Sequence, residues 1–311
     1  MTKIFIDGKA GTTGLRIYER LESFEGIELI SLDDEKRKDP ECRKAALNSA
    51  DIAFLCLPDD AARESVSLIE NENTVVIDTS TAHRTLDDWA YGFPELSASH
   101  REKIKNSKRI AVPGCHASGF ISLIYPLVEA GILKNTEKLS CFSLTGYSGG
   151  GKKMIAEYED ENRSPLFDAP RQYGLTQMHK HLKEMKIISG LEYDPAFCPV
   201  VADFYSGMET IIPLFKSQLR GTVKDIEKVY QDLYQGPVVK YESFAKDGMI
   251  SAAAMKSRDD LLIHVEGNED RILLTAVFDN LGKGASGAAI QNMNIVMGIE
   301  ETAGLVTGET L

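Results

Sequence analysis

The stretch KIFIDGKAGTTGLRIYERLESF, residues 3–24, decides the fold. Its first part is an apolar run typical of a buried strand, and apolar residues then recur at helical spacing along its second part. Between the two, Gly8, Gly11 and Gly14 mark a tight turn at the start of the helix. A strand, a glycine turn and a helix in this order are typical of the beginning of a doubly wound α/β sheet.

The same alternation continues after this stretch. Three further apolar runs are expected to be strands, over residues 27–32, 51–58 and 74–80. Two segments between them have helical character, over residues 39–49 and 59–72. Because strands joined through helices pair in parallel, the pattern predicts an α/β fold with a doubly wound parallel Rossmann sheet and helices on both faces.

The pattern changes in the second half of the chain. Strand-like stretches there are longer and have fewer helices between them, over residues 139–151, 200–215, 248–255, 260–268 and 271–280. They predict a second α+β domain with a mixed or antiparallel sheet. Residues 284–301 are helical again and are expected to return to the first domain. The predicted domains are therefore 1–114 plus 286–311, and 115–285.

Composition excludes several classes of protein. The chain has 311 residues and a net charge of -12 without acidic blocks, which argues against a general nucleic-acid surface. No segment approaches the roughly 18 apolar residues that a membrane span needs, and the N-terminus has no signal-peptide pattern. Five cysteines without CxxC spacing suggest neither a disulfide framework nor a zinc site. Free thiols in the cytoplasm are expected.

The glycine turn predicts a dinucleotide site. Glycines allow close backbone approach, and the helix N-terminus offers free N–H groups and a positive dipole end to a phosphate. The residues expected to bind the cofactor here are Gly8, Gly11, Thr12, Thr13 and Gly14. Their spacing departs from GxGxxG, so a turn without a ligand is the alternative. The position after the first strand favours the cofactor.

The choice between NAD and NADP depends on SLDDEKRKD, residues 31–39. Asp33 could accept the ribose hydroxyl groups of NAD, whereas Lys36, Arg37 and Lys38 could neutralise the 2′-phosphate of NADP. A solvated charged loop is the third possibility. The residues alone leave the three open.

A cysteine lies at a second strand-to-helix turn, in RIAVPGCHASGF, residues 109–120. The N-terminus of a helix favours the thiolate form, so Cys115 is a candidate nucleophile. Gly114 and the small residues after the cysteine leave room for a substrate. The other four cysteines have unremarkable flanks and are interpreted as small buried residues.

A cysteine nucleophile needs a proton donor or acceptor, and MHKHLKEM offers His179 and His181. On a strand the two rings would share a face, and an HxH pair can bind a metal ion. No third ligand is evident nearby, so we predict no metal site. The other histidines are expected to pack or to face solvent, although His116 adjoins the thiol.

Two further stretches have the character of anion sites. DTSTAHR ends a predicted strand with Ser80 and Arg84, and TGYSGGGKK leaves another through three glycines toward Lys153. Glycine-rich backbone near a cation suits a phosphate or an oxyanion. For the second stretch, a flexible hairpin tip is the alternative.

Together, six motifs resemble the short form of the N-acetyl-gamma-glutamyl-phosphate reductase family of arginine biosynthesis, within the wider semialdehyde dehydrogenase group. They are GKAGTTG, YGFPEL, VPGCHASGF, TGYSGGGKK, MHKHLKEM and KGASGAAIQNMN, and they hold their order along the chain. The resemblance implies an NADP-binding Rossmann domain and a central α+β domain with dimer contacts, in a homodimer or homotetramer.

The resemblance also implies roles for single residues. Cys115 falls on the family's nucleophile and His181 on its general acid/base. Ser80 and Asn292 are expected to contact the cofactor. The expected contacts of the acyl phosphate are Arg84, His179, Gly149 and Lys153. The sequence departs from the family where His116 and Ala117 replace a Tyr-Pro of the longer form, and where SGGGKK has Lys in place of Arg.

The predicted function is NADPH-dependent reduction of N-acetylglutamyl 5-phosphate to the 5-semialdehyde and phosphate, through a thioester on Cys115. Sulfur suits this reaction because a thioester accepts hydride where a carboxylate does not. Alternatives are another acyl-phosphate reductase, acting on aspartyl phosphate or a carrier-linked amino-acid phosphate, and a non-catalytic NADP-binding regulator. A dehydrogenase of alcohols would leave Cys115 without a role.

Overall fold

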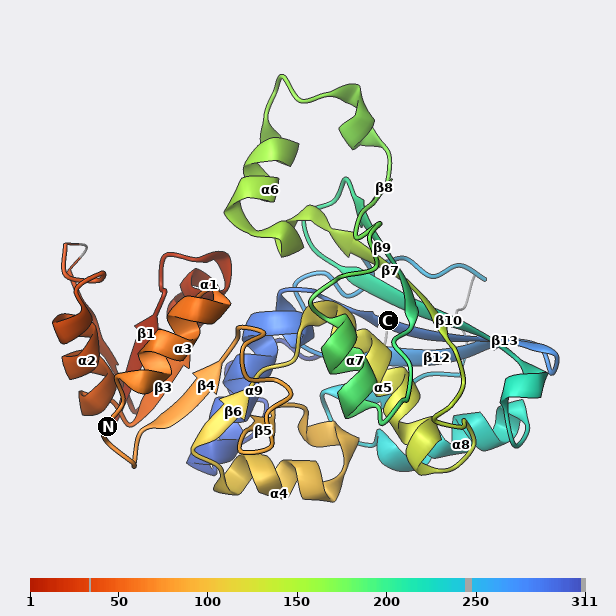
Figure 1. The fold of residues 1–311 in the computed structure, drawn as a ribbon, viewed down its shortest axis with the longest axis horizontal. Coiled ribbons are helices and arrows are strands. Elements are labelled where there is room, and N and C mark those ends of the chain that lie inside the picture. The colour runs from red at the N-terminus through yellow and green to blue at the C-terminus, as the bar shows by residue number, and fades with distance from the viewer. Residues whose placement is uncertain (34, 244–247, 309–311) are drawn as a thin grey trace. The chain divides into compact units, whose positions relative to one another are not determined.

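A computed structural model describes residues 1–33, 35–243 and 248–308 (Figure 1). The chain forms two compact units. The first consists of Met1–Pro94, Ala98–Gly114 and Ala285–Leu305, and the second of Glu95–Ser97, Cys115–Gly284 and the residues from Val306 onward. Relative to the predicted limits, the second unit also takes in Glu95–Ser97 and, among the described residues, 306–308, whereas Ala285 lies in the first unit.

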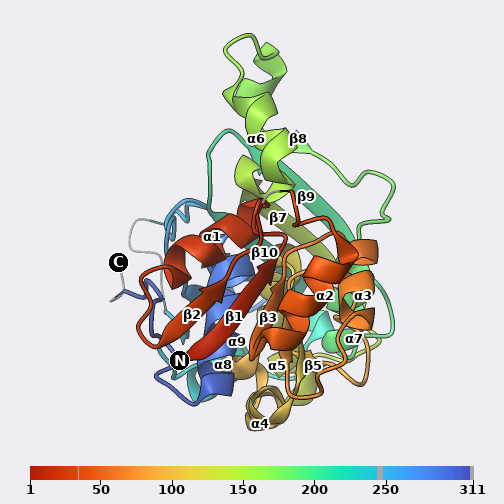
Figure 2. The same ribbon diagram turned by 90° about the vertical axis from the view of Figure 1, so that its left-hand side faces the viewer.

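The first unit is the predicted Rossmann domain. Over the described residues its sheet has six strands in the order β2-β1-β3-β4-β6-β5, and every neighbouring pair is parallel. Figure 2 faces this sheet at β1, with β2 and β3 on either side. The strands are β1 (Thr2–Asp7), β2 (Ile27–Ile30), β3 (Ile52–Leu55), β4 (Val75–Asp78), β5 (Ala90–Tyr91) and β6 (Arg109–Ala111). The helices are α1 (Thr12–Leu21), α2 (Pro40–Ser49), α3 (Asp59–Ser67), α4 (Ala98–Asn106) and α9 (Gly287–Met297).

Side chains of alternate strand residues fill two separate cores, because successive residues of a strand point to opposite faces. Ile4 and Ile6 of β1 belong to a core that also includes residues of α1, α4 and α9. Phe5 belongs to the core on the other face, with residues of α2 and α3. Burial on both faces explains why these strands are continuously apolar.

The second unit contains the predicted mixed sheet. Among the described residues it has seven strands in the order β11-β12-β13-β10-β7-β9-β8. The pairs β7–β9 and β11–β12 are parallel and the other pairs are antiparallel. The strands are β7 (Ser140–Gly146), β8 (Arg171–Gln172), β9 (Ala196–Ala202), β10 (Met208–Phe215), β11 (Val239–Tyr241), β12 (Leu261–Gly267) and β13 (Arg271–Phe278). The helices are α5 (Cys115–Glu129), α6 (Gly151–Glu159), α7 (Leu182–Ile188) and α8 (Val223–Leu233).

Helix α5 lies against this sheet and carries the candidate nucleophile at its first position. A side chain at Gly119 would clash with Thr210 of β10, so a glycine is needed for the close approach. Pro126 has no N–H to donate to the carbonyl of Ser122, four residues earlier. That carbonyl accepts instead from the hydroxyl of Tyr234, 2.7 Å away, so the proline within the helix leaves no unpaired group there.

Two of the predicted strands in this unit are wrong in detail. Residues 200–215 form the end of β9, a turn and β10, rather than one strand. Residues 248–255 are not a strand: they are irregular up to residue 251 and form turns from residue 252 onward. They are apolar because they cover the sheet: Met255 packs on Leu262 and Val277. No described helix is long and apolar enough to cross a membrane.

Candidate active site

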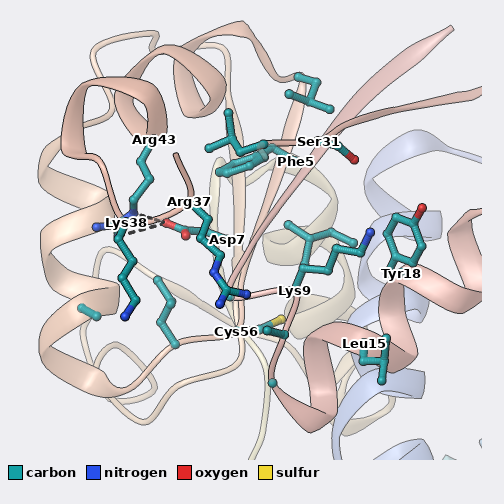
Figure 3. A pocket seen from close by; sticks show the side chains of 18 of the residues that line it. Phe5, Asp7, Lys9, Leu15, Tyr18, Ser31, Arg37, Lys38, Arg43 and Cys56 are labelled. Atoms are coloured by element: carbon teal, nitrogen blue, oxygen red, sulfur yellow. Dashed lines mark hydrogen bonds and ion pairs between the residues drawn. The ribbon is translucent and has the colours of Figure 1, made fainter. Parts of the chain in front are cut away.

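The first unit contains a cavity of about 760 Å³ beside the glycine turn. Residues from β1, α1, β2, α2 and α3 line it, among them Gly8, Gly11, Arg37, Lys38 and Arg43 (Figure 3). It lies where β1 ends and α1 begins, which is the position of a dinucleotide in doubly wound sheets.

The glycine turn is built for close backbone approach. Gly8 has φ +88°, a conformation that other residues rarely adopt, and a side chain there would clash with the carbonyl of Cys56. A Cβ at Gly14 would lie 2.5 Å from the carbonyl oxygen of Gly8. No described side chain caps α1 at Gly11, so the first turn of the helix, which holds Thr12 and Thr13, presents its N–H groups to a ligand.

Cationic side chains enter the cavity from the loop after β2 and from α2. Arg37 and Lys38 line it, whereas Asp33 and Lys36 do not. Asp33 is exposed and lies 3.5 Å from Lys36, so the predicted ribose acceptor is engaged in an ion pair outside the cavity. Asp34, in the same stretch, lies outside the described residues.

Arg43 is a charged residue of the cavity that the sequence analysis missed. It is buried, and its Nη2 donates to Asp7 Oδ2 at 3.0 Å and to Ser65 Oγ at 2.6 Å. Asp7 is the last residue of β1, so this ion pair fixes the floor of the cavity next to the glycine turn (Figure 3). With Lys9, which also lines the cavity, the chain thus offers four cations and an open helix N-terminus, which fit an anionic dinucleotide.

The other residues predicted for the cofactor or phosphate in the first unit are buried and bonded within it. Ser80 donates to Asp78 at 2.6 Å. Arg84 donates to the backbone carbonyls of Val112 and Thr79, at 2.8 and 2.9 Å. Asn292 donates to the carbonyls of Gly92 and Ala288, while its own carbonyl oxygen is buried without a hydrogen bond to the described residues. Their contacts with ligands stay predictions.

In the second unit, Cys115 is half-buried at the first position of α5. Its Cβ lies against Gly284 so closely that a Cβ added to that glycine would be 2.8 Å away. The N-terminal N–H groups of a helix stabilise a nearby thiolate, so the structure gives Cys115 the setting that the sequence predicted.

A chain of buried hydrogen bonds follows Cys115. The ring of His116 lies 2.7 Å from Ser143 Oγ through Nδ1 and 2.5 Å from the hydroxyl of Tyr173 through Nε2. Ser143 Oγ in turn lies 3.2 Å from Thr210 Oγ1. His116 was expected only to adjoin the thiol, but it joins α5, β7 and β10 to the loop that carries Tyr173.

His179 and His181 lie beside this network. They are in the turn before α7 and not on a strand, so they do not share a sheet face. Their rings are nonetheless close, with centroids 4.8 Å apart, and the His181 ring is 5.7 Å from that of His116. Gln177 holds this turn on β9, because its side-chain amide exchanges hydrogen bonds of 2.7 and 2.8 Å with the backbone of Phe197.

Burial sets the protonation of the cluster. It lowers the pKa of His116 to about 3, with help from the charges of His179 and Lys180. It lowers the pKa of His179 to about 4, again with Lys180 contributing. Burial and the charge of Cys115 raise the pKa of Tyr173. At neutral pH His116 and His179 are therefore neutral imidazoles and Tyr173 is a protonated phenol, which can donate to His116 Nε2.

The glycine-rich stretch TGYSGGGKK leaves the end of β7, as predicted, and is not a hairpin tip. Residues Tyr147–Gly150 form a 3-10 turn that leads into α6. Asn280 anchors this turn by donating to Ser148 Oγ at 3.0 Å, and a Cβ at Gly149 would lie 3.3 Å from the Asn280 amide. Lys153 on α6 is exposed and lies 3.9 Å from Glu157. The phosphate contacts of Gly149 and Lys153 stay predictions.

Tyr173 and Gly284 could not be found by local pattern. Tyr173 is an isolated tyrosine in a loop. It is brought to the site because the preceding strand β8 pairs with β9, a contact that local sequence does not indicate. Gly284 stands at the start of the segment 284–301, which was predicted to be helical, and that pattern did not indicate a contact with the nucleophile. Within the described ranges, no three His, Cys, Asp or Glu side chains are grouped as around a metal ion.

Comparisons with known proteins match both units. Residues 3–107 match the family described as semialdehyde dehydrogenase, NAD binding domain. Residues 115–280 match the family described as semialdehyde dehydrogenase, dimerisation domain. The assignment of the cofactor cavity to the first unit and of the thiol to the second agrees with this division.

Similar whole chains support the same family. N-acetyl-gamma-glutamyl-phosphate reductase 2 of Nostoc sp. is 43% identical over 97% of this chain and 99% of its own. The N-acetyl-gamma-glutamyl-phosphate reductase of Chelativorans sp. is 46% identical over 95% and 98%.

Solved structures share the fold at low identity. Aspartate semialdehyde dehydrogenase II of Vibrio cholerae, complexed with ASA, has a TM-score of 0.71 at 16% identity, covering 96% of this chain and 98% of its own. Aspartate semialdehyde dehydrogenase of Candida albicans, with NADP, has a TM-score of 0.67 at 16% identity over the same shares. The predicted class, an oxidoreductase with a nicotinamide-dinucleotide domain, is confirmed. The chain belongs to the semialdehyde dehydrogenase family and, within it, to the N-acetyl-gamma-glutamyl-phosphate reductases.

Proposed function

We propose that the protein reduces N-acetylglutamyl 5-phosphate to N-acetylglutamate 5-semialdehyde with NADPH, as a step of arginine biosynthesis. The observation that carries the proposal is Cys115 at the N-terminus of α5, in one unit with the rings of His116, His179 and His181. The names of relatives more than 40% identical supply the substrate. A thiolate in that place suits an acyl phosphate, which already carries a leaving group.

The first step is acylation of the enzyme. The Cys115 thiolate attacks the acyl carbon, a carbon–sulfur bond forms, and the carbon–oxygen bond to phosphate breaks, with its electron pair leaving on phosphate. The N–H groups at the start of α5 stabilise the oxyanion of this step. His116 and Tyr173 are both uncharged, so neither places a negative charge near the thiolate that would destabilise it.

The second step reduces the thioester. NADPH, when bound, supplies a hydride to the thioester carbonyl. His181 donates a proton at the resulting thiohemiacetal oxygen and takes it back as the aldehyde leaves. Collapse of the thiohemiacetal breaks the carbon–sulfur bond and restores the Cys115 thiolate for the next turnover.

NADP is the cofactor that the cavity of the first unit fits best. Arg37 and Lys38 line it, Arg43 is held in place at its floor, and the one candidate ribose acceptor, Asp33, does not line it. Two cations of the β2 loop line the cavity, whereas Asp33 pairs with Lys36 outside it, and this arrangement favours a 2′-phosphate over bare hydroxyl groups.

Replacing both loop cations should change cofactor preference. In Arg37→Gln/Lys38→Gln, we expect KM for NADPH to rise about 10- to 100-fold, because hydrogen bonds to a charged group contribute about 1.5–3 kcal/mol. Steady-state rates with NADPH and NADH measure this, and the NADH constants should hold. Lys44→Gln on the outer face of α2, where Lys44 pairs with Glu70, is the matched control. Equal losses with both cofactors would contradict the assignment.

The reaction itself is tested in the oxidative direction. Purified protein, inorganic phosphate and NADP⁺ are mixed with N-acetylglutamate 5-semialdehyde or with aspartate semialdehyde, and NADPH is followed by absorbance. We expect kcat/KM for the N-acetylated substrate to be about 100-fold higher, since a site built for one polar substrate rejects a shorter one strongly. A preference for aspartate semialdehyde would support the rival reductase, and no reaction with either would support a non-catalytic protein.

The second unit matches a dimerisation domain, and we propose that the protein works as a homodimer or homotetramer. The open face of its sheet supports this, because Phe142, Phe215 and Leu273 are large apolar residues exposed on β7, β10 and β13. We further propose a cytoplasmic location, since a thiol nucleophile needs a reducing compartment to stay free.

A further inference from the structure

The second unit contains a buried ion pair that the proposed reaction does not use. Lys283 Nζ lies 2.8 Å from both carboxylate oxygens of Glu95, and the two side chains are 2% and 8% exposed. Both residues stand in motifs of unassigned role, YGFPEL and KGASGAA. They are 188 residues apart, so the pair joins distant parts of the chain.

Stability alone is a weak reason for such a pair. Removing two charges from water is costly, and an apolar pair of similar volume often stabilises a fold as well. A second reason to keep a buried ion pair is that it holds the neighbouring residues in one conformation. Lys283 lies in a single turn of π-helix at Gly282–Ser286, and this turn touches Cys115 through Gly284.

Lys283 stands between two glycines, and each of them packs closely against another part of the unit. A side chain on Gly282 would clash with the carbonyl of Arg258, and a Cβ on Gly284 would lie 2.8 Å from Cys115 Cβ. At its start the turn is held by the buried Asp279, whose carboxylate accepts from the N–H of Leu281 at 2.7 Å. Further along the turn, Lys283 is held by its ion pair with Glu95.

Glu95 also lies in the neighbourhood of the helix of the nucleophile. Burial and the charges of Tyr230 and Glu95 raise the pKa of Tyr234. The Tyr234 hydroxyl donates to the carbonyl of Ser122 within α5. The carboxylate that holds Lys283 is therefore close enough to act on a side chain that is bonded to the helix beginning with Cys115.

We propose that Glu95 and Lys283 are positioning residues: their ion pair holds the turn at residues 282–284 against the Cβ of Cys115 and fixes the sulfur at the N-terminus of α5. The chemical role of the Cys115 sulfur rests on the proposed function. Its position beside the turn does not, so the position is tested by an experiment that does not need the reaction.

The test is alkylation of Cys115 by iodoacetamide across pH in the full-length protein, with the adduct located by mass spectrometry. The variants are Lys283→Met, Glu95→Gln and the two combined, which removes both charges with little change of shape. If the pair positions the sulfur, all three should shift the midpoint of the pH profile upward, since the thiolate loses the helix N–H groups. Where the proposed reaction is confirmed, kcat should also fall about 10-fold with KM for NADPH unchanged.

Other outcomes overturn the proposal. Opposite shifts in the two single variants would mean that the Lys283 charge acts directly on the thiolate. An unchanged profile in folded variants would mean that the pair is only structural. Arg163→Met, which removes an ion pair with Asp203 elsewhere in this unit, is the control for loss of stability and should leave the profile unchanged. Since alkylation needs no substrate, absence of reductase activity would not affect the result.

Discussion

Cys115→Ser should lower turnover by roughly 10³-fold or more while NADPH binds as before. Losses of this size follow when a covalent nucleophile is removed, since the remaining interactions only bind and orient the substrate. A serine hydroxyl at the same position is not ionised at neutral pH and makes an ester, which accepts hydride less readily than a thioester. Steady-state rates and NADPH titration by fluorescence separate the two effects.

The control and the trapping experiment make this prediction specific. Cys198→Ser changes a half-buried thiol on β9 of the same unit and should leave the rates unchanged. In the wild-type protein, substrate without NADPH should leave an acyl group on Cys115 that mass spectrometry detects. An adduct on another side chain, or equal loss of catalysis and cofactor binding in Cys115→Ser, would refute the assignment.

His181→Asn should lower kcat by about 10²- to 10⁴-fold, the usual contribution of one general acid/base, and should leave acylation intact. The reason is that the proton transfers assigned to His181 belong to the reduction and collapse of the thiohemiacetal, whereas phosphate leaves without protonation. A rapid-quench measurement of phosphate release should show a burst of about one phosphate per active site, followed by a slow steady rate.

A matched histidine variant gives the comparison. His100→Asn on α4, in the other unit, should leave both phases unchanged. If His181→Asn abolishes the burst, His181 acts in acylation, and its neighbour His179 would have to be tested for the later proton transfers. The His181 ring lies close to those of His116 and His179, so structural damage is checked by the thermal midpoint of each variant.

Periodic features were predictable from the sequence. Strands of the first unit are apolar on both faces and alternate with helices, so their order and parallel pairing follow from local pattern. Cys115 could be placed at a helix start for the same reason. Residues 248–255 misled the prediction because an apolar segment that covers a sheet has the composition of a strand within it. Only the packing of Met255 on the sheet tells the two apart.

Features made by distant residues could not be predicted. Tyr173, Ser143 and His116 meet because α5 lies on a sheet whose strands are far apart in sequence. Arg84 and Asn292 are predicted ligands, but each donates hydrogen bonds to two backbone carbonyls of its own unit. Whether a polar residue binds a ligand or its own fold depends on the tertiary structure.

The excursion at Glu95–Ser97 has a consequence for protein engineering. These three residues belong to the second unit although the sequence around them builds the first. A truncated fragment of residues 115–284 would lack Glu95, the ion-pair partner of the buried Lys283. In a chimera whose cofactor-binding half comes from another parent enzyme, Glu95 and Lys283 would come from different parents. Recombination points should therefore keep these two residues from the same parent.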